Sequence, residues 1–181
     1  MTVYCAFLRG INVGGNKMDM KELTQVFKAM GFLDAVTVFG TGNVVFSAKS
    51  DPKALKLLIE SRLSAHFSYD AHIFLRNSFQ LKEVLDRAAL YPVPEDYHQY
   101  FLLCDDLNAI VALNQYFKSA QHAEHESLVT LDNGLLWQVP QGQTLRSDFG
   151  KEALGRKYTT SLTSRNIHTL EKAYSLMKTE K

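Results

Sequence analysis

A β-hairpin is predicted by the segment Val36-Thr37-Val38-Phe39-Gly40-Thr41-Gly42-Asn43-Val44-Val45-Phe46-Ser47-Ala48. Two runs rich in valine and phenylalanine, residues 36–39 and 43–48, flank a short Gly-Thr-Gly turn. β-Branched and aromatic residues favour strands, and glycines supply the backbone conformations that tight turns need. The hairpin therefore provides a centre from which the flanking elements can be predicted.

The segments on either side of the hairpin predict helices with defined starts. Asp19 precedes apolar residues at helical spacing, and Gly31 follows them; Asp51 is followed by Pro52 and a second apolar stripe. These are typical N-cap, C-terminal and first-turn signals. Apolar residues 2–11 and 71–75 predict strands at the two ends. The order βαββαβ is that of a ferredoxin-like unit.

The remainder of the chain nearly repeats this order after a helix capped by Ser78 and a connector that contains Pro92 and Pro94. We predict strands at 98–104, 127–131 and 135–139, a helix at 108–117, helical residues from 148 and an amphipathic terminal helix over 161–178. The repetition is architectural, without residue-level identity between the halves. We therefore predict an α+β fold of two ferredoxin-like (βαββαβ-type) subdomains packed as one compact unit. Their predicted bounds are 1–76 and 98–181, joined by a helix and Pro-containing connector at 77–97.

Composition is that of a globular protein: 181 residues, 46% hydrophobic and 22% charged, with 20 basic and 19 acidic side chains. A chain of this length can bury roughly 70% of its unfolded surface without a metal or disulfide. The N-terminal residues lack signal-peptide features, and no apolar run approaches the ~18 residues of a membrane span. Cys5 and Cys104 lie in apolar, strand-like runs typical of buried thiols. We expect a cytoplasmic protein with no membrane contact, disulfide, metal or cofactor.

Charge is distributed unevenly along the chain. Residues 83–132 carry nine acidic and two basic groups, whereas residues 146–181 carry eight basic and four acidic groups, and residues 1–82 are also basic on balance. If the two basic ends meet in space, that face would attract anions. Solvated helix faces explain the same charges equally well.

The first candidate site is the segment Arg9-Gly10-Ile11-Asn12-Val13-Gly14-Gly15-Asn16-Lys17, between the first strand and the first helix. Glycines let backbone N–H groups approach a ligand, and a helix N-terminus with two cations favours an anion. Its spacing differs from both the P-loop and the G-x-G-x-x-G dinucleotide pattern. A plain strand-to-helix turn is the alternative interpretation.

Two further segments carry weaker signals. Residues 39–46 keep the glycines of an RNA-recognition strand motif, but the basic position and the two base-stacking aromatic positions are missing. Arg165 and Asn166 are expected near the first turn of the terminal helix, where the helix dipole disfavours a cation. An acidic partner within the protein or an anionic ligand would explain Arg165.

No catalytic constellation is identified, since no nucleophile elbow or reactive-thiol context occurs. The spacing of His122 and His125 is found at some metal sites, but a polar approach to a strand explains it better. Whether the protein is an enzyme stays open at this point, and the balance favours a non-enzymatic role.

Three segments of the chain resemble the bacterial family known as DUF1697, a domain of unknown function. They are Leu8-Arg9-Gly10-Ile11-Asn12-Val13-Gly14-Gly15, then Gly42-Asn43-Val44-Val45-Phe46, and Thr163-Ser164-Arg165-Asn166 with Thr169. The resemblance implies a cytosolic α+β fold with ferredoxin-like subdomains and no assigned reaction. The family often has serine where this chain has Thr41, and tryptophan where it has Ile167.

We expect a non-catalytic binder of a phosphate-bearing ligand, either a nucleotide or a nucleic-acid backbone. The predicted site comprises Arg9, Asn12, Gly14, Gly15, Lys17, Thr41, Asn43, Arg165 and Asn166. The two arginines would clamp the anion, the paired glycines would cradle it, the lysine would add charge, and the asparagines and threonine would orient it. The alternative is a structural or regulatory protein that acts through homo-oligomer or protein-partner contacts. The sequence predicts no oligomeric state.

Overall fold

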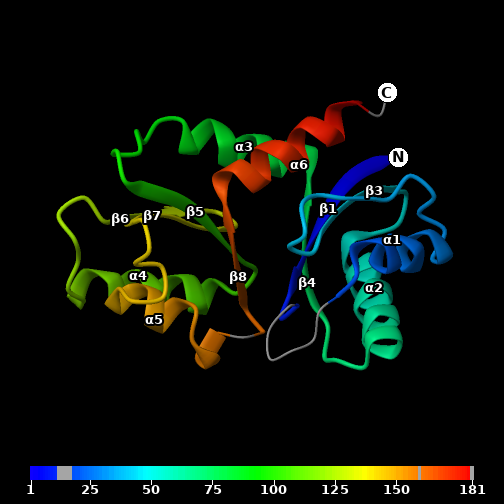
Figure 1. The fold of residues 1–181 in the computed structure, drawn as a ribbon, viewed down its shortest axis with the longest axis horizontal. Coiled ribbons are helices and arrows are strands. Elements are labelled where there is room, and N and C mark those ends of the chain that lie inside the picture. The colour runs from blue at the N-terminus through cyan, green and yellow to red at the C-terminus, as the bar shows by residue number, and fades with distance from the viewer. Residues whose placement is uncertain (12–17, 159, 180–181) are drawn as a thin grey trace. The chain divides into compact units, whose positions relative to one another are not determined.

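The computed structural model describes residues 1–11, 18–158 and 160–179 (Figure 1). Two four-stranded antiparallel sheets and their helices confirm the predicted α+β fold with two ferredoxin-like subdomains. The described residues divide into two compact units, one from Met1–Glu83 with Thr169–Lys181 and one from Val84–His168. The bounds 1–76, 77–97 and 98–181 expected from the sequence stay a prediction.

The first unit has the order βαββαβ. Its elements are β1 (Thr2–Arg9), α1 (Met20–Ala29), β2 (Val36–Thr37), β3 (Asn43–Ala48), α2 (Pro52–Phe67) and β4 (His72–Asn77). The strands lie in the order β2-β3-β1-β4. Side chains of α1 and α2 share one core with Ala6 and Leu8 of β1 and Phe46 of β3, so both helices pack on the same face of the sheet.

The two helices of the first unit begin at the capping residues that the sequence predicts. Asp19 accepts hydrogen bonds from the backbone N–H groups of Lys21 (2.7 Å) and Glu22 (3.0 Å). Asp51 does the same for the first turn of α2, with Pro52 as the first helical residue. Caps of this kind satisfy donors that a helix leaves unpaired, so the helix starts are fixed by the nearby sequence.

The second unit repeats the same topology. Its elements are β5 (Tyr97–Cys104), α4 (Leu107–Ser119), β6 (Ser127–Leu131), β7 (Gly134–Pro140), α5 (Asp148–Ala153), a 3-10 turn (Arg156–Tyr158) and β8 (Leu162–Asn166). The strand order β6-β7-β5-β8 matches that of the first sheet. Helices α4 and α5 pack on one face, with Trp137 and Phe149 in the core between helices and sheet.

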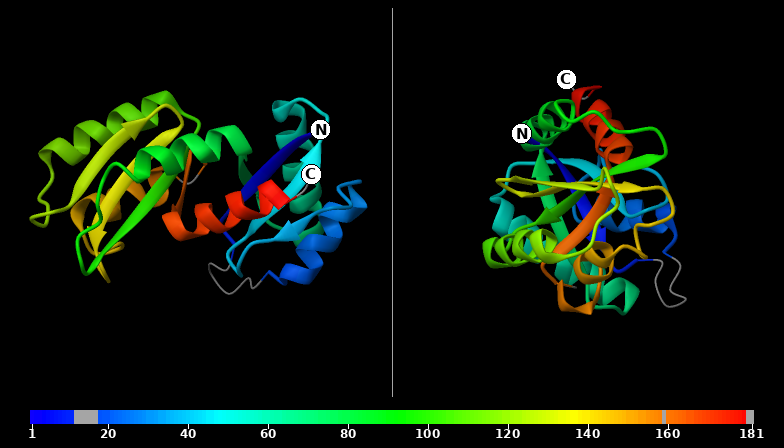
Figure 2. Two further views of the ribbon diagram at one scale, coloured as in Figure 1. Left: turned by 90° about the horizontal axis from the view of Figure 1, so that it is seen from above. Right: turned by 90° about the vertical axis from the view of Figure 1, so that its left-hand side faces the viewer.

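Each ferredoxin-like motif is followed by a helix. Helix α3 (Ser78–Ala88) follows β4, and α6 (Ile167–Thr179) follows β8. The boundary between the units falls within α3 after Glu83, and near the start of α6 after His168. In the first unit, the far end of α6 lies near β1 in all views (Figure 1, Figure 2).

The prediction of a single helix over 161–178 is wrong at its start. Residues Leu162–Asn166 form β8, which pairs with β5, and α6 begins only at Ile167. Leu162 and Thr163 are buried in this strand. The apolar stripe that predicted the helix begins at Ile167, so the pattern located the helix and missed the strand before it. Among the described residues, no helix is long and apolar enough to cross a membrane.

The core of the second unit contains a buried polar pair. The indole N–H of Trp137 donates to the carboxylate of Glu126 (Nε1 to Oε1, 3.0 Å), and the second oxygen of Glu126 accepts from the Ala123 N–H (3.3 Å). Trp137 is fully buried and Glu126 nearly so. Glu126 therefore satisfies two donors at the start of β6.

We expect Glu126→Ala to lower the free energy of unfolding by about 1–3 kcal/mol, because the buried indole N–H loses its acceptor. Urea unfolding followed by the fluorescence of Trp137, the single tryptophan, measures this loss. Glu124→Ala is the control, since that side chain is 88% exposed. Equal stabilities of the Glu126 variant and wild type would contradict the prediction.

A partly buried tyrosine, Tyr69, lies in the segment between α2 and β4, and its hydroxyl oxygen is buried. The hydroxyl of Tyr69 has no hydrogen-bond partner among the described residues. Burial, and secondarily the negative charge of Glu60, raises the pKa of Tyr69 to about 12. In an unfolded chain a tyrosine ionises near pH 10, so the folded state holds this proton to a higher pH than the unfolded state does.

Stability should therefore fall as the pH rises from about 10 towards about 12, and Tyr69→Phe should remove this part of the fall. The variant should lose no stability at neutral pH, since no hydrogen bond is removed. Urea unfolding at about pH 8 and about pH 11 tests both statements. Tyr116→Phe, at an exposed position of α4, serves as control and should retain the wild-type pH dependence.

Candidate functional site

Arg9 ends β1 on the face of the first sheet opposite α1 and α2. Ala6 and Leu8 contribute to the core under the helices, and the alternation of a strand places Arg9 on the other face. The residue is partly buried. This burial lowers the pKa of the Arg9 guanidinium below its ordinary value. A partly desolvated cation interacts more strongly with an anion than a fully hydrated one does.

Gly10 ends the strand because its backbone is left-handed, with φ of +74°. Among the described residues other than its two chain neighbours, no heavy atom lies within 4 Å of the position that a Cβ would take there. The described part of the structure therefore leaves space at the Gly10 backbone beside Arg9. The predicted strand 2–11 is thus two residues shorter in the structure, and the shortening exposes this corner.

The turn of the β2–β3 hairpin packs against the same corner. The Leu8 N–H donates to the Gly42 carbonyl (2.8 Å), and the Ile11 side chain lies directly over the Gly42 Cα. Gly42 has φ of +67°. The structure therefore brings together the described part of the first candidate segment and the hairpin turn.

Asn43 and Thr41 stabilise that turn. Asn43 is fully buried, and its side-chain amide donates to the Val38 carbonyl (3.0 Å) and to the Thr41 hydroxyl (2.9 Å). Thr41 is exposed at the tip. Asn43 therefore has a structural role in the hairpin, whereas Thr41 faces outward next to the end of β1.

Arg165 and Asn166 lie at the end of β8, in the second unit, and not in the first turn of a helix as predicted. The Arg165 guanidinium donates through Nη1 to the Thr163 hydroxyl (2.9 Å) and to the Ser164 carbonyl (2.8 Å). Asn166 accepts from the His168 N–H (3.0 Å) and so caps α6. These contacts stabilise the connection between β8 and α6.

The first unit contains the same corner at Arg76 and Asn77, which the sequence analysis missed. Each of the two arginines, Arg76 and Arg165, donates to the backbone carbonyl of the residue before it, at 2.8 Å in both. Asn77, like Asn166, accepts a backbone N–H of the helix that follows. Both pairs end the fourth strand of their sheet, so the Arg-Asn dipeptide is residue-level identity between the halves.

His72 is a second residue that the sequence analysis missed. In the pairing of β1 with β4, His72 lies directly opposite Arg9. Directly opposite residues of an antiparallel pair point to the same face, so both side chains lie at the corner described above. Only the strand register reveals this relation, because 62 positions separate the two residues along the chain.

The predicted site residues thus fall into three groups. Arg9, Thr41 and Asn43 belong to one unit and gather at one end of its sheet. Arg165 and Asn166 belong to the other unit, and their joint action with Arg9 stays a prediction. The remaining residues lie outside the described part of the chain: Asn12, Gly14, Gly15 and Lys17.

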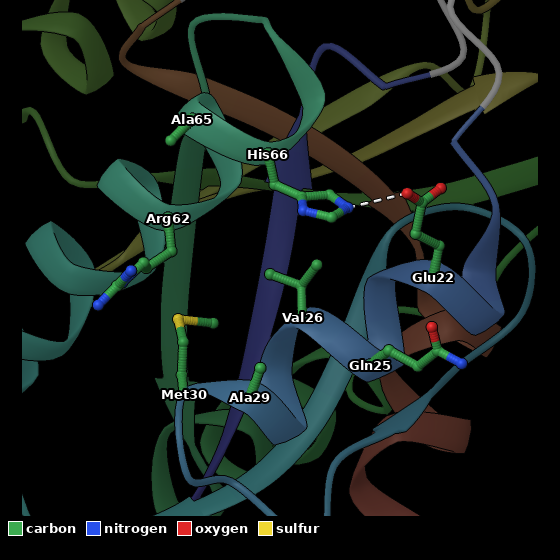
Figure 3. Close-up of a pocket in the computed structure, with 8 residues that line it drawn as sticks. All are labelled: Glu22, Gln25, Val26, Ala29, Met30, Arg62, Ala65 and His66. Atoms are coloured by element: carbon green, nitrogen blue, oxygen red, sulfur yellow. Dashed lines mark hydrogen bonds and ion pairs between the residues drawn. The ribbon is translucent and has the colours of Figure 1, made fainter.

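A pocket of about 530 Å³ lies between α1 and α2 (Figure 3). These helices cover the face of the first sheet opposite Arg9. The pocket is lined by Glu22, Gln25, Val26, Ala29, Met30, Arg62, Ala65 and His66. His66 and Glu22 bridge the two helices at 2.8 Å, and their side chains are 45% and 50% exposed. The pocket is an open surface depression of mixed charge, which favours no single ligand class.

A smaller pocket, of about 240 Å³, lies in the second unit beside His122 and Arg146. The His122 ring stacks on Phe117 with 4.1 Å between the ring centroids. Within the described ranges, no group of three or more His, Cys, Asp or Glu side chains could hold a metal ion. The described contact of the His122 ring is thus its stacking on Phe117.

The sequence was compared with known proteins. Residues 1–133 match the family described as "Protein of unknown function (DUF1697)". The chain belongs to this family. The match covers most of the chain, including the corner at Arg9 and the hairpin turn, and it confirms the family inferred from the sequence. The third motif, residues 163–169, lies outside the matched range. No curated protein matches the sequence.

Among solved structures, a conserved bacterial protein from Streptococcus pneumoniae is similar, with a TM-score of 0.75. The two chains are 22% identical, and the match covers 97% of this DUF1697 chain and 98% of the other. At this identity the likeness shows the fold alone. The arrangement of two ferredoxin-like halves in one chain is therefore shared between the two proteins.

The stability cost of adding a side chain at Gly42, in the hairpin turn, can be compared with the cost of adding one at Gly10, at the end of β1. A Cβ at position 42 would collide with the Ile11 side chain and lie 3.2 Å from Leu8 Cβ, whereas a Cβ at position 10 has no heavy atom of the described, non-adjacent residues within 4 Å. We expect Gly10→Ala to cost about 1 kcal/mol from its left-handed backbone, and Gly42→Ala to cost about 1–3 kcal/mol more from overpacking. Urea unfolding of both variants measures the difference. Equal losses would show that the turn does not pack tightly on β1.

Proposed function

We propose that this protein is a non-catalytic binder of a phosphate-bearing ligand and that Arg9 is its principal anion contact. The observation that supports this proposal is the partly buried Arg9 guanidinium, whose pKa burial lowers, beside the open backbone of Gly10. A cation that has lost part of its hydration gains more from an anionic partner than a solvated surface arginine would.

The chemistry of the corner suits a phosphate group. Arginine presents a planar fork of N–H donors that matches two oxygens of one phosphate. Gly10 has no side chain to block the approach of an oxygen to the backbone, and the exposed Thr41 hydroxyl stands on the hairpin turn that packs against Leu8. The hydrogen bonds of Asn43 hold that turn in place.

The remaining predicted residues belong to the same proposal. Backbone N–H groups of Gly14 and Gly15 would cradle the phosphate, Asn12 and Lys17 would add contacts, and the residues of the second unit, Arg165 and Asn166, would complete the clamp. The ligand would be a nucleotide or a nucleic-acid backbone in the cytoplasm. Both carry the phosphate that this chemistry recognises.

Calorimetric titration with inorganic pyrophosphate, nucleoside phosphates and short oligonucleotides tests the proposal. Wild type should bind at least one of these probes, and Arg9→Ala should weaken that binding by at least about tenfold, because a charge-assisted hydrogen bond is lost. Arg62→Ala, which removes an exposed arginine of α2, is the matched control and should bind as wild type does. Absent binding throughout, or equal binding by the Arg9 variant, would refute the proposal.

A structural or regulatory role through homo-oligomer or partner contacts is the second candidate. The burial and internal hydrogen bonds of Asn43 favour it, because they show that part of the hairpin motif serves the fold. The melting temperature separates the two candidates. If Arg9→Ala mainly lowers the melting temperature and changes no binding, the corner is structural; if folding is intact and binding is lost, it is a ligand site.

A further inference from the structure

The residues that line the smaller pocket, of about 240 Å³, belong to the second unit. One wall comes from residues 121–123 and Glu126, between α4 and β6, and the other comes from the segment that joins β7 to α5. Amide, hydroxyl and charged side chains dominate both walls. The volume lies below the roughly 300–1,000 Å³ that is typical of sites for drug-sized molecules, so we expect a small and polar ligand.

Backbone hydrogen bonds hold both walls of the pocket. In the first wall, the Glu126 N–H donates to the Ala123 carbonyl (3.0 Å). In the second wall, the N–H groups of Arg146 and Ser147 both donate to the Gln143 carbonyl, each at 2.8 Å. The chain itself therefore shapes the turns that carry the lining side chains, which lowers the cost of ordering them around a ligand.

Glu126 places a buried carboxylate in the pocket wall, where only 8% of the residue is exposed. Each oxygen accepts one hydrogen bond, from the Trp137 indole N–H or from the Ala123 N–H. Both donors are uncharged, and no basic side chain of the described residues forms an ion pair with Glu126. Carboxylates are seldom buried without a cationic partner. A carboxylate has about four acceptor positions, so Glu126 retains acceptor capacity for a cationic ligand.

Arg146 lines the same pocket with the opposite charge. Within the described ranges, its guanidinium forms no hydrogen bond or ion pair with another side chain. Asp148 also lines the pocket, but its carboxylate pairs with Lys151 of α5 (3.5 Å). The pocket therefore holds one anionic and one cationic side chain, Glu126 and Arg146, that do not neutralise each other. A ligand that carries both charges can pair with each of them.

We propose that this pocket binds a free amino acid with a short polar side chain, whose ammonium group contacts Glu126 and whose carboxylate contacts Arg146. An ammonium group supplies three donors and the charge that the buried carboxylate lacks. Arginine presents a planar fork of donors that matches the two oxygens of a carboxylate. The side-chain amides of Gln121 and Gln143 donate and accept hydrogen bonds, which suits a polar ligand side chain. Only residues of the second unit carry this proposal, so it is independent of the phosphate site.

The indole N–H of Trp137 reports on the pocket, because it donates to Glu126 and the chain has a single tryptophan. Its NMR signal is followed while L-serine is added to the full chain, and we expect a saturable shift. Ethanolamine, which lacks the carboxylate, and β-hydroxypropionate, which lacks the amine, should each bind at least about tenfold more weakly, because each loses one charge-assisted contact. The absence of a saturable shift with L-serine, or equal binding of the three compounds, would overturn the proposal.

Arg146→Ala tests the contact with the ligand carboxylate. The variant should fold as wild type does, since the side chain is exposed. It should bind L-serine at least about tenfold more weakly and ethanolamine equally well. Arg87→Ala, which removes an exposed arginine of α3, is the matched control and should bind as wild type does. Equal affinity of the two variants for L-serine would refute the role of Arg146. Tighter binding of inorganic phosphate than of L-serine would make the pocket an anion site and overturn the proposal.

Glu126→Gln tests the contact with the ligand ammonium group. Glutamine keeps an oxygen that can accept from the Trp137 indole N–H but carries no charge. L-Serine and ethanolamine should both bind at least about tenfold more weakly, and β-hydroxypropionate should bind as in wild type. Glu124→Gln is the control, because that side chain is 88% exposed. An unchanged affinity of Glu126→Gln for L-serine would show that the carboxylate serves the indole alone, and it would refute the proposal.

Discussion

In each half, a backbone hydrogen bond holds the hairpin turn against the end of the first strand, and the arrangement of the neighbouring residues depends on this contact. In the first unit the Leu8 N–H donates to the Gly42 carbonyl (2.8 Å), and in the second the Cys104 N–H donates to the Asn133 carbonyl (3.3 Å). Each bond joins the end of the first strand to the turn before the third strand. Because the first strand pairs with both the third and the fourth, this contact fixes where the chain leaves the sheet. The position of Arg9 follows from it.

The parts of the fold that were predictable from the sequence are those that local chemistry decides. Asp19 and Asp51 cap helices through N–H groups two and three residues away, and such signals are visible in the sequence. Residues 162–166 are different, because they become a strand through pairing with β5 across some 60 positions of chain. Nothing local in Leu-Thr-Ser-Arg-Asn distinguishes this strand from a polar approach to the helix at Ile167.

The candidate site, like the fold, could be predicted from the sequence only where local patterns decide it. Arg9 and Thr41 stand out as polar residues beside glycines at the ends of apolar runs, which is a local pattern. His72 becomes part of the corner only through the register of β4 on β1, and a shift of one residue would turn it to the other face. The amide of Asn43 points into the hairpin because Val38 has a carbonyl to be satisfied there, a need that arises only in the folded turn.

The two halves share a topology but not a charge at this corner. Cys5 of β1 pairs with Arg76, and Phe101 of β5 pairs with Arg165. The residue four positions after Cys5 is Arg9, the last of β1, and the residue four positions after Phe101 is Asp105, the first after the end of β5. Asp105 is exposed, and Asp106 after it caps α4. Two carboxylates repel a phosphate where an arginine attracts one. The repeated backbone therefore carries an arginine at this corner in the first half and a carboxylate in the second, so the charge of the corner is set by the side chain and not by the topology.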